Sequence, residues 1–341
     1  MNLDGKRVLV TGGTGSLGQH VVRRLLSGGA GAPARVVVLS RDEAKQHDMR
    51  LGTLGPAVAT DDVIFEQRRS RLGFRIGDVR DLPTMMDAVR ESDVVIHAAA
   101  LKQVPTCEYF PREAVFTNVL GADTLVRAVQ AVGAHVEAVV GISTDKACKP
   151  VNVMGMTKSL MERIFVAANV AGLPTRFMCV RYGNVIASRG SVFPLFEQQA
   201  ASGGPVTVTS FDMTRFLLTL EQATDVIFAA LEHGRAGEII VPRAPAARVV
   251  DIARAIIGDR AIPVREIGIR PGEKIHEIMV SEEECARTSE RAGFYAIAPM
   301  LPELREAVPA PAGLEGEYSS AEVTLDASGV RALIDEAPVR I

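Results

Sequence analysis

Asp145 and Lys146 are adjacent ionisable residues in the stretch GISTDKACKP, which follows a valine-rich apolar run. An acid beside an amine can perform general acid–base chemistry if burial raises the pKa of one group and lowers that of the other. The alternative is a solvated ion pair in a loop, which is common on protein surfaces. We do not expect that alternative here, because the pair follows a predicted central strand, at the sheet edge where α/β folds bind ligands.

Gly12, Gly15 and Gly18 lie between the first predicted strand and the first predicted helix. Glycine has no Cβ, so the backbone can turn sharply and approach a pyrophosphate, whose charge meets the free N–H groups of the helix N-terminus. The alternative is a turn that only joins two elements. Because the glycines directly follow the strand, and their spacing resembles the turn of the short-chain dehydrogenases/reductases, we predict a dinucleotide-binding turn. The other predicted contacts in this turn are Thr14, Ser16 and Leu17.

The second predicted strand ends in VVVLSRDE, where an NAD-specific fold usually offers an acid to the adenosine ribose. Arg41 stands there instead, and its planar guanidinium suits a 2′-phosphate, so we predict NADP rather than NAD. Alternatively, Ser40 and Glu43 form a capping box while Arg41 points into water, and both arrangements can hold together. Asp78, after the third predicted strand, is a candidate for the adenine amino group or for a helix cap. The remaining predicted cofactor contacts are Ser40, Val79, Ala98 and Ala99.

Short apolar runs alternate with longer amphipathic stretches in the first half of the chain. The runs are RVLVT at 7–11, RVVVL at 35–39, FRIG at 74–77, DVVIHA at 93–98 and EAVVGIS at 137–143. This alternation predicts βαβ units, and runs without polar alternation suit strands that helices cover on both faces. Leu17, Val21 and Leu25 recur every four residues, so they are predicted to face the sheet from the first helix. The predicted fold class is α/β, a Rossmann-type doubly wound parallel sheet with a smaller C-terminal substrate-binding lobe.

The pattern loosens after about residue 185, where SGGP, VPRAP and a proline-rich stretch indicate loops. We predict an NADP-binding Rossmann domain over residues 1–185, which includes the catalytic segment 143–158. Residues 186–341 are predicted to form mainly the substrate-binding lobe, with some segments returning to the Rossmann domain.

The composition of the chain argues against several classes of function. Its 38 Lys and Arg residues stand against 41 Asp and Glu, a balance that lacks the basic excess of nucleic-acid-binding proteins. No uninterrupted run of 18 apolar residues is present and the N-terminus shows no secretion signal, so we expect a cytoplasmic protein with no membrane association of its own. The four cysteines are widely spaced, which predicts reduced thiols and no metal site.

The STDK segment at 143–146 and four further stretches of the chain resemble the motifs of a known family. The four further stretches are HAAALKQVPTCEYFPREAVFTNVLGADTL at 97–125, RYGNVIASRGSVFPLF at 181–196, MTRF at 213–216 and RPGEKIHE at 270–277. With these motifs in this order, the chain resembles the UDP-N-acetylglucosamine 4,6-dehydratases, extended short-chain dehydrogenases/reductases of polysaccharide biosynthesis. The resemblance implies NADP-dependent conversion of UDP-N-acetylglucosamine to a 4-keto-6-deoxy sugar, through oxidation at C4, loss of water across C5 and C6, and hydride return to C6.

The resemblance also implies roles for single residues. Thr144 would hydrogen-bond the C4 oxygen, Asp145 would protonate the departing C6 hydroxyl, Lys146 would act at C5, and Lys158 would bind the nicotinamide ribose. Met154 stands where the wider superfamily has tyrosine, and a thioether has no proton to exchange. Thr144 with a water, or the Asp145–Lys146 pair, must then deprotonate the C4 hydroxyl. The implied substrate contacts are Lys102, Met154, Asn184, Arg189, Ser191, Arg270 and Glu273.

Two other functions stay open at this point. A UDP-sugar 4-epimerase would use the same hydride removal but return the hydride to C4. Asp145 and Lys146 favour dehydration, because an epimerase needs no acid at C6 and no base at C5. A non-enzymatic NADP sensor that lost its tyrosine is the other alternative, and the intact sugar-side motifs argue against it.

Two further expectations concern a single residue and the assembly. Lys102 is expected to reach either the sugar or a loop carbonyl. The resemblance to the family implies a homo-oligomer.

Overall fold

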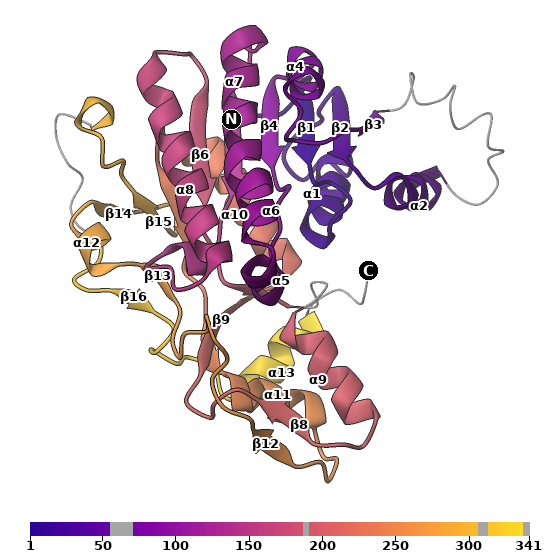
Figure 1. Ribbon diagram of the computed structural model, residues 1–341, viewed down its shortest axis with the longest axis vertical. Coiled ribbons are helices and arrows are strands. Elements are labelled where there is room, and N and C mark those ends of the chain that lie inside the picture. The colour runs from indigo at the N-terminus through magenta and orange to yellow at the C-terminus, as the bar shows by residue number, and fades with distance from the viewer. Residues whose placement is uncertain (55–70, 187–190, 306–312, 337–341) are drawn as a thin grey trace.

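The structure is a computed structural model that describes residues 1–54, 71–186, 191–305 and 313–336 (Figure 1). A nine-stranded sheet with the order β14-β15-β10-β6-β5-β4-β1-β2-β3 forms the centre of this described part. The pairs from β3 to β10 are parallel, whereas β15 pairs antiparallel with both β10 and β14. Its strands are β1 (Arg7–Thr11), β2 (Arg35–Ser40), β3 (Leu72–Ile76), β4 (Val94–His97), β5 (Ala138–Ile142), β6 (Arg176–Val180), β10 (Ile239–Pro242), β14 (Thr288–Arg291) and β15 (Phe294–Ile297). The predicted fold class is confirmed.

The continuous apolar runs of the central strands are explained by two hydrophobic cores, one on each face of the sheet. On β2, Val37 and Leu39 pack into one core, and Val36 and Val38 pack into the other. Both faces of the strand are therefore buried, so neither face selects polar residues.

Helices cover both faces of the sheet (Figure 1). Side chains of α1 (Ser16–Leu26) and α10 (Leu220–His233) pack into one core, and those of α4 (Leu82–Arg90), α7 (Gly121–Val132) and α8 (Val153–Ala168) pack into the other. In α1, Val21 and Leu25 are buried, as their spacing predicts. The other helical segments of this half are α2 (Glu43–Leu54), α5 (Val104–Tyr109), α6 (Pro111–Ala114), the π-helical η1 (Val115–Leu120), and the 3-10 turns η2 (Asp145–Ala147) and η3 (Asn169–Ala171).

The C-terminal half contains a third hydrophobic core, which includes Phe193, Val206, Ile252 and Leu333. Helices α9, α11 and α13 gather beside the end of the large sheet (Figure 1). Strands β10, β14 and β15 return to the large sheet, while the domain boundary at residue 185 stays a prediction. The elements of this half outside the large sheet are β7 (Asn184–Val185), α9 (Val192–Ala201), β8 (Val206–Val208), β9 (Thr214–Leu218), β11 (Ala246–Arg248), α11 (Val249–Ile257), β12 (Val264–Glu266), β13 (Ile278–Val280), α12 (Glu282–Cys285), η4 (Pro302–Leu304), β16 (Tyr318–Ser319) and α13 (Ala327–Glu336).

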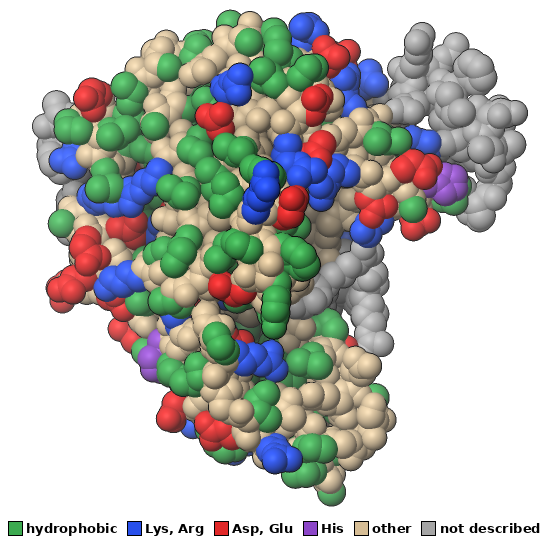
Figure 2. All heavy atoms as spheres, viewed as in Figure 1, with side chains coloured by type: hydrophobic (Ala, Val, Ile, Leu, Met, Phe, Trp, Pro, Cys, Tyr) green, Lys and Arg blue, Asp and Glu red, His purple; other side chains and the backbone are tan. Residues whose placement is uncertain are grey.

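Hydrophobic side chains lie among charged ones on the face formed by α5 to α8 (Figure 2). Tyr109, Phe110, Met156 and Leu160 are exposed there. Exposed apolar side chains of this kind are often covered in protein interfaces, and the homo-oligomer stays a prediction. Within the described ranges, none of the helices combines the length and the apolar character needed to span a membrane.

Candidate active site

The predicted site residues follow parallel strands that end at one edge of the sheet. Thr11 is in register with Leu39 of β2 and with His97 of β4, and His97 is in register with Gly141 of β5. Ser40, Ala98 and the STDK segment therefore follow neighbouring strand ends, the position where open α/β sheets bind ligands.

The glycine turn after β1 is too closely packed for larger residues. A Cβ on Gly12, which has φ +67°, would lie 2.7 Å from the backbone nitrogen of Ala99, and one on Gly18 would lie 2.6 Å from the Gly12 carbonyl oxygen. Gly13, which the sequence prediction did not include, is equally confined, because its Cβ would lie 2.8 Å from Val38. Gly15 is the N-cap of α1 without a side-chain cap, and the first turn holds no acid. This geometry fits a bound pyrophosphate.

The backbone after β4 forms the other side of this turn. The N–H of Ala98 donates to the Thr11 carbonyl oxygen over 3.1 Å, and the hydroxyl of Thr11 lies 2.9 Å from Nδ1 of His97. Burial lowers the pKa of His97 to about 3, so this core imidazole is neutral. Val79 is buried in the core, and its cofactor contact stays a prediction.

Arg41 lies at the end of β2, with its side chain 54% exposed, and Nη1 is 3.5 Å from Oδ2 of Asp78. Arg80, which the sequence prediction missed, donates from Nε to both carboxylate oxygens of Asp78 and from its backbone N–H to Oδ1. Burial alone would raise the pKa of Asp78, but Arg80 and Arg41 outweigh it and lower the pKa. Two guanidinium groups therefore lie beside Asp78 at the end of the second and third strands.

Ser40 is not part of a capping box with Glu43. Its hydroxyl accepts a hydrogen bond from Nε2 of Gln46 over 3.1 Å, and Asp42 instead accepts from the backbone N–H of Lys45 at the start of α2. The predicted capping box is therefore wrong, whereas the exposure of Arg41 agrees with the other part of that alternative.

Buried Asp145 forms a hydrogen-bonded unit with the partly buried Thr144 and Lys146. The Thr144 hydroxyl donates to Oδ1 of Asp145 over 2.9 Å, and Nζ of Lys146 donates to the same oxygen over 3.1 Å. The Asp145 side chain is fully buried, and its second oxygen, Oδ2, has no hydrogen-bond partner in the structure. The Asp145 backbone N–H donates to the carbonyl of Tyr182, which fixes the segment to the end of β6.

A second carboxylate, that of Glu277, lies 3.2 Å from Nζ of Lys146. Burial alone would lower the pKa of Lys146, but the charges of Asp145 and Glu277 outweigh it, so the pKa is raised. The sequence hypothesis made acid–base chemistry conditional on burial raising the pKa of one group and lowering that of the other. At Lys146 burial is outweighed, partly by a residue 131 positions away along the chain.

Met154 and Lys158 lie on the buried face of α8, as their spacing predicts. Lys158 donates from Nζ to the carbonyl of Ile142 over 2.7 Å, and burial lowers its pKa to about 8. Met154 packs against Cys107 and Ala114. The Met154 side chain is thus a packing group.

Predicted substrate residues contain buried polar atoms that lack a partner. They are Oδ1 of Asn184, Oγ of Ser191 and Oε2 of Glu273. Leaving such atoms unpaired costs free energy, which a bound ligand would recover by hydrogen bonding. Lys102 is exposed, yet partial burial of its amine lowers its pKa. Arg189 lies outside the described residues.

The segment 270–277 packs against the catalytic segment. Nδ2 of Asn152 donates to the carbonyl of Gly272 over 2.7 Å, and Nζ of Lys274 donates to the carbonyl of Cys148 over 2.6 Å. Arg270 is exposed at the start of this segment. The RPGEKIHE motif indicated the segment, but the sequence prediction named Arg270 and Glu273 and missed Lys274 and Glu277.

A buried ion-pair network lies beside the catalytic segment. Arg181, which follows β6, contacts Glu162 of α8 and Glu284 of α12, each with a shortest nitrogen–oxygen distance of 2.8 Å. Ser143 donates to Glu162, and Nη1 of Arg181 also donates to the carbonyl of Met279. The network therefore joins the residue before Thr144 to two helices.

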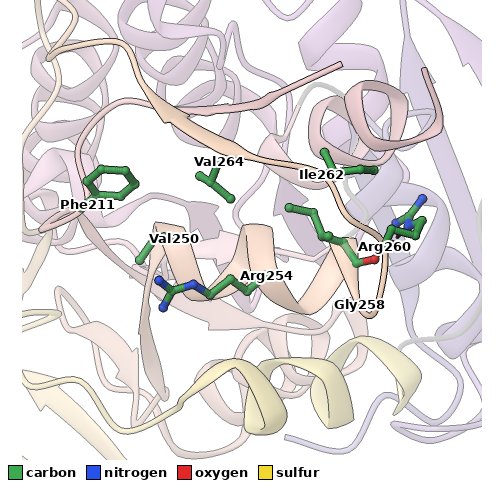
Figure 3. A pocket seen from close by; sticks show the side chains of 8 residues that line it. Phe211, Val250, Arg254, Gly258, Arg260, Ile262 and Val264 are labelled. Atoms are coloured by element: carbon green, nitrogen blue, oxygen red, sulfur yellow. Dashed lines mark hydrogen bonds between the residues drawn. The ribbon is translucent and has the colours of Figure 1, made fainter. Parts of the chain in front are cut away.

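A separate cavity of about 420 Å³ lies along α11, lined by Phe211, Val250 and Arg254 among others (Figure 3). It contains none of the predicted site residues. Its two arginines are already engaged, Arg254 with Asp251 and Arg260 with carbonyls at the end of α11. We therefore place the candidate active site at the edge of the large sheet.

Comparisons with known proteins agree with this fold. The family described as "Polysaccharide biosynthesis protein" matches residues 8–299. A protein of Rickettsia akari named UDP-glucose 4-epimerase is 43% identical over 298 residues, which cover 86% of this chain and 82% of the relative, and a protein of the same name from Rickettsia prowazekii is equally similar.

Solved structures show the same architecture. Pen from Bacillus thuringiensis has a TM-score of 0.85 at 32% identity, with 98% of this chain and 99% of that chain covered. DesIV, a dTDP-glucose 4,6-dehydratase from Streptomyces venezuelae with NAD and TYD bound, has a TM-score of 0.65 at 24% identity, over 79% and 86% of the two chains. The latter likeness supports the fold alone.

Proposed function

Because the chain belongs to the polysaccharide biosynthesis protein family, we propose that it is a nucleotide-sugar enzyme that removes water from UDP-N-acetylglucosamine. The observation that carries the proposal is the buried pair of Asp145 and Lys146 at the ligand-binding edge of the sheet. Elimination across C5 and C6 needs an acid and a base on one substrate, and adjacent residues can serve both atoms.

NADP is the cofactor that we propose for this site. Gly12, Gly13 and Gly18 allow the backbone to turn closely at the uncapped N-terminus of α1, whose free N–H groups suit a pyrophosphate, and the exposed Arg41 offers a guanidinium group for a 2′-phosphate. When bound, the dinucleotide supplies hydride acceptance and donation.

The chain's own residues handle the protons. Thr144 hydrogen-bonds the C4 oxygen, Asp145 protonates the departing C6 hydroxyl, and Lys146 acts at C5. The unpartnered Oδ2 of Asp145 supports its role, because that oxygen is free to carry the donated proton. The Thr144 hydroxyl donates to Asp145, which supports a route for the C4 proton that bypasses Met154. Lys158 holds the nicotinamide ribose.

The UDP-sugar is proposed to contact residues from both halves of the chain. The unpaired polar atoms of Asn184, Ser191 and Glu273 are suited to hydrogen-bond sugar or ribose hydroxyls. The exposed guanidinium of Arg270 suits the diphosphate, and the Lys102 amine suits an anionic or hydroxyl group.

A UDP-sugar 4-epimerase is the second candidate, because the relatives from Rickettsia carry that name at 43% identity. Such an enzyme would leave Asp145 and Lys146 without a reaction at C6 and C5. Their burial together is the observation that favours dehydration.

Incubation of the purified protein with UDP-N-acetylglucosamine separates the two candidates. Mass spectrometry of the product should show the loss of one water. An unchanged mass together with a new C4 epimer, seen by NMR, would support the epimerase instead. An unaltered substrate in the presence of NADP+ would contradict both activities.

Arg41→Asp is expected to shift cofactor preference from NADP+ toward NAD+. The substitution removes the guanidinium beside the 2′-phosphate and places an acid where a ribose diol would bind. Calorimetric affinities for NADP+ and NAD+ would measure the shift, with Lys45→Asp as a charge-matched control on the exposed part of α2. Equal affinities of the wild type for the two cofactors would contradict the assignment of Arg41.

Met154→Leu is expected to preserve most activity, because the thioether only packs against Cys107 and Ala114. Thr144→Val, at nearly constant volume, is expected to slow the hydride-transfer step by about 10²-fold. Single-turnover appearance of NADPH absorbance measures that step in both variants. An equally large loss in Met154→Leu, with cofactor still bound, would mean that the sulfur does more than pack.

A further inference from the structure

Ser143 is the first residue of the turn 143–148, which carries the proposed acid–base groups. It is 3% exposed, and its hydroxyl donates to Oε1 of Glu162 over 2.5 Å. Arg181 donates to the same oxygen from Nε over 3.1 Å, and to Oε2 from Nη2 over 2.8 Å. Both oxygens of this buried carboxylate are engaged by one cation, so Glu162 offers Ser143 a fixed acceptor.

Cys148 is the last residue of the same turn, and it contacts the other carboxylate of the network. Its thiol lies 3.7 Å from Oε2 of Glu284, the oxygen that also accepts from Nη1 of Arg181 over 2.8 Å. Burial raises the pKa of Cys148 to about 12, so the sulfur keeps its proton and can donate. Arg181 therefore joins both ends of the turn through two carboxylates, and we refer to Glu162, Arg181 and Glu284 as the clamp.

Thr144 lies directly after Ser143, at the point where the turn leaves the sheet. Its backbone is extended, with φ −152° and ψ 156°, and its hydroxyl donates to Oδ1 of Asp145 over 2.9 Å. The Ser143 backbone N–H donates to the Val180 carbonyl, and the Ser143 hydroxyl attaches this point to α8 through Glu162. The direction in which the Thr144 hydroxyl points therefore depends on a side-chain contact of the residue before it.

We propose that the clamp fixes both ends of the turn 143–148 and that Ser143 is a positioning residue for oxidation at C4. Ser143 acts through Thr144, because its bond to the clamp sets where the Thr144 hydroxyl points. Small displacements matter here, since a shift of about 1 Å in a reacting group can slow a step by about 10²-fold. The catalytic consequence rests on the proposed role of Thr144, whereas the clamp itself can be tested without turnover.

The first test measures hydrogen exchange in the purified protein, by mass spectrometry of peptides that cover 143–148. Ser143→Ala removes the hydroxyl and leaves the ion pairs of the clamp in place. Exchange in these peptides should become about tenfold faster, the effect of losing one hydrogen bond to a charged group. Cys148→Ala should also speed exchange, but by less, because a thiol is a weak donor.

Ser92→Ala is the matched control. Ser92 is 1% exposed, and its hydroxyl donates to the Ala88 carbonyl over 2.7 Å. This change also removes a buried, hydrogen-bonded hydroxyl, but it lies before β4 begins, at the opposite edge of the sheet. It should leave the exchange of the turn and the rate of oxidation at C4 unaltered, whereas an effect of general destabilisation would appear in this variant as well.

The second test measures oxidation at C4, by single-turnover appearance of NADPH absorbance with UDP-N-acetylglucosamine. In Ser143→Ala this step should slow by about tenfold, less than in Thr144→Val, because the Thr144 hydroxyl is displaced rather than removed. Binding of the UDP-sugar, measured by calorimetry, should stay unchanged. In the double variant, Ser143→Ala should add no loss to that of Thr144→Val, because both changes act through one hydroxyl.

Unchanged exchange of the turn in Ser143→Ala would overturn the clamp, whatever reaction the enzyme performs. Unchanged exchange in Cys148→Ala would overturn its Glu284 end. Faster exchange in Ser143→Ala, with no NADPH absorbance in the wild type, would refute the proposed function and keep the clamp. Faster exchange with a normal rate of oxidation, or additive losses in the double variant, would overturn the link to Thr144.

Ser143→Cys takes the place of Ser143→Ala if the latter does not fold. Its thiol has nearly the volume of the hydroxyl but is a weaker donor, so exchange of the turn should still be faster than in the wild type. Exchange at the wild-type rate in Ser143→Cys would contradict the clamp.

Discussion

Arg181→Met is expected to lower the free energy of unfolding by about 3–5 kcal/mol, because it leaves the buried carboxylate of Glu162 without its cation and that of Glu284 with only Arg287, 3.4 Å away. Arg181 is 2% exposed, and its guanidinium makes five hydrogen bonds, to Glu162, Glu284 and the Met279 carbonyl. Burial alone would raise the pKa of Glu284, but Arg181 outweighs it and lowers the pKa. The stabilisation from this pair is therefore present above the ordinary glutamate pKa and is lost as the pH falls below it.

Urea unfolding at neutral pH measures this loss. The control is Arg331→Met, which removes an exposed pair with Asp335 in α13 and should cost less than about 0.5 kcal/mol. Adding Glu162→Gln and Glu284→Gln to Arg181→Met removes the uncompensated charges and should recover part of the stability. If Arg181→Met unfolds like Arg331→Met, the network is not what holds these elements together.

The central elements of the fold follow from local pattern. The run RVLVT predicts β1 at its observed bounds, because four consecutive apolar or β-branched positions between two cores leave little choice of structure. The glycines after it are recognisable for the same local reason, since a Cβ at Gly12 or Gly18 has no space. The proximity of Asp145 and Lys146 could likewise be predicted, because the two residues are adjacent in the sequence.

Partners that are distant in sequence could not be predicted this way. Glu277 lies beside Lys146 in a segment, 270–277, that is hydrogen-bonded to Thr214 and Ser320. The periodicity of the sequence does not predict that this segment packs against the catalytic segment. Arg181 follows the apolar strand β6, and its sequence context does not show that carboxylates from two helices meet it there. The contribution of Glu277 to the raised pKa of Lys146 could not be predicted for this reason.

Asp145→Asn is expected to reduce the rate of water loss by about 10²–10⁴-fold, the range for a positioned proton-transfer group. The amide keeps the shape of the side chain but cannot protonate the departing C6 hydroxyl. Lys146→Ala should have a similar effect, because it removes the amine that acts at C5. Binding of UDP-N-acetylglucosamine should stay within about tenfold, or about 1.4 kcal/mol, since neither residue is proposed to anchor the nucleotide.

Single-turnover mass spectrometry measures the water loss, and calorimetry measures the binding. Glu315→Gln, an exposed change outside the site, provides the control for loss of one negative charge. Because Asp145→Asn removes the carboxylate that accepts from Thr144, oxidation at C4 should slow in this variant too. Lys146→Ala leaves Thr144 and Asp145 in place, so a build-up of NADPH absorbance there would identify a stalled ketone. Near-normal water loss in either variant would contradict the acid–base pair. Loss of substrate binding together with activity would instead make the pair an anchor for the sugar, since a residue that only transfers protons leaves binding intact.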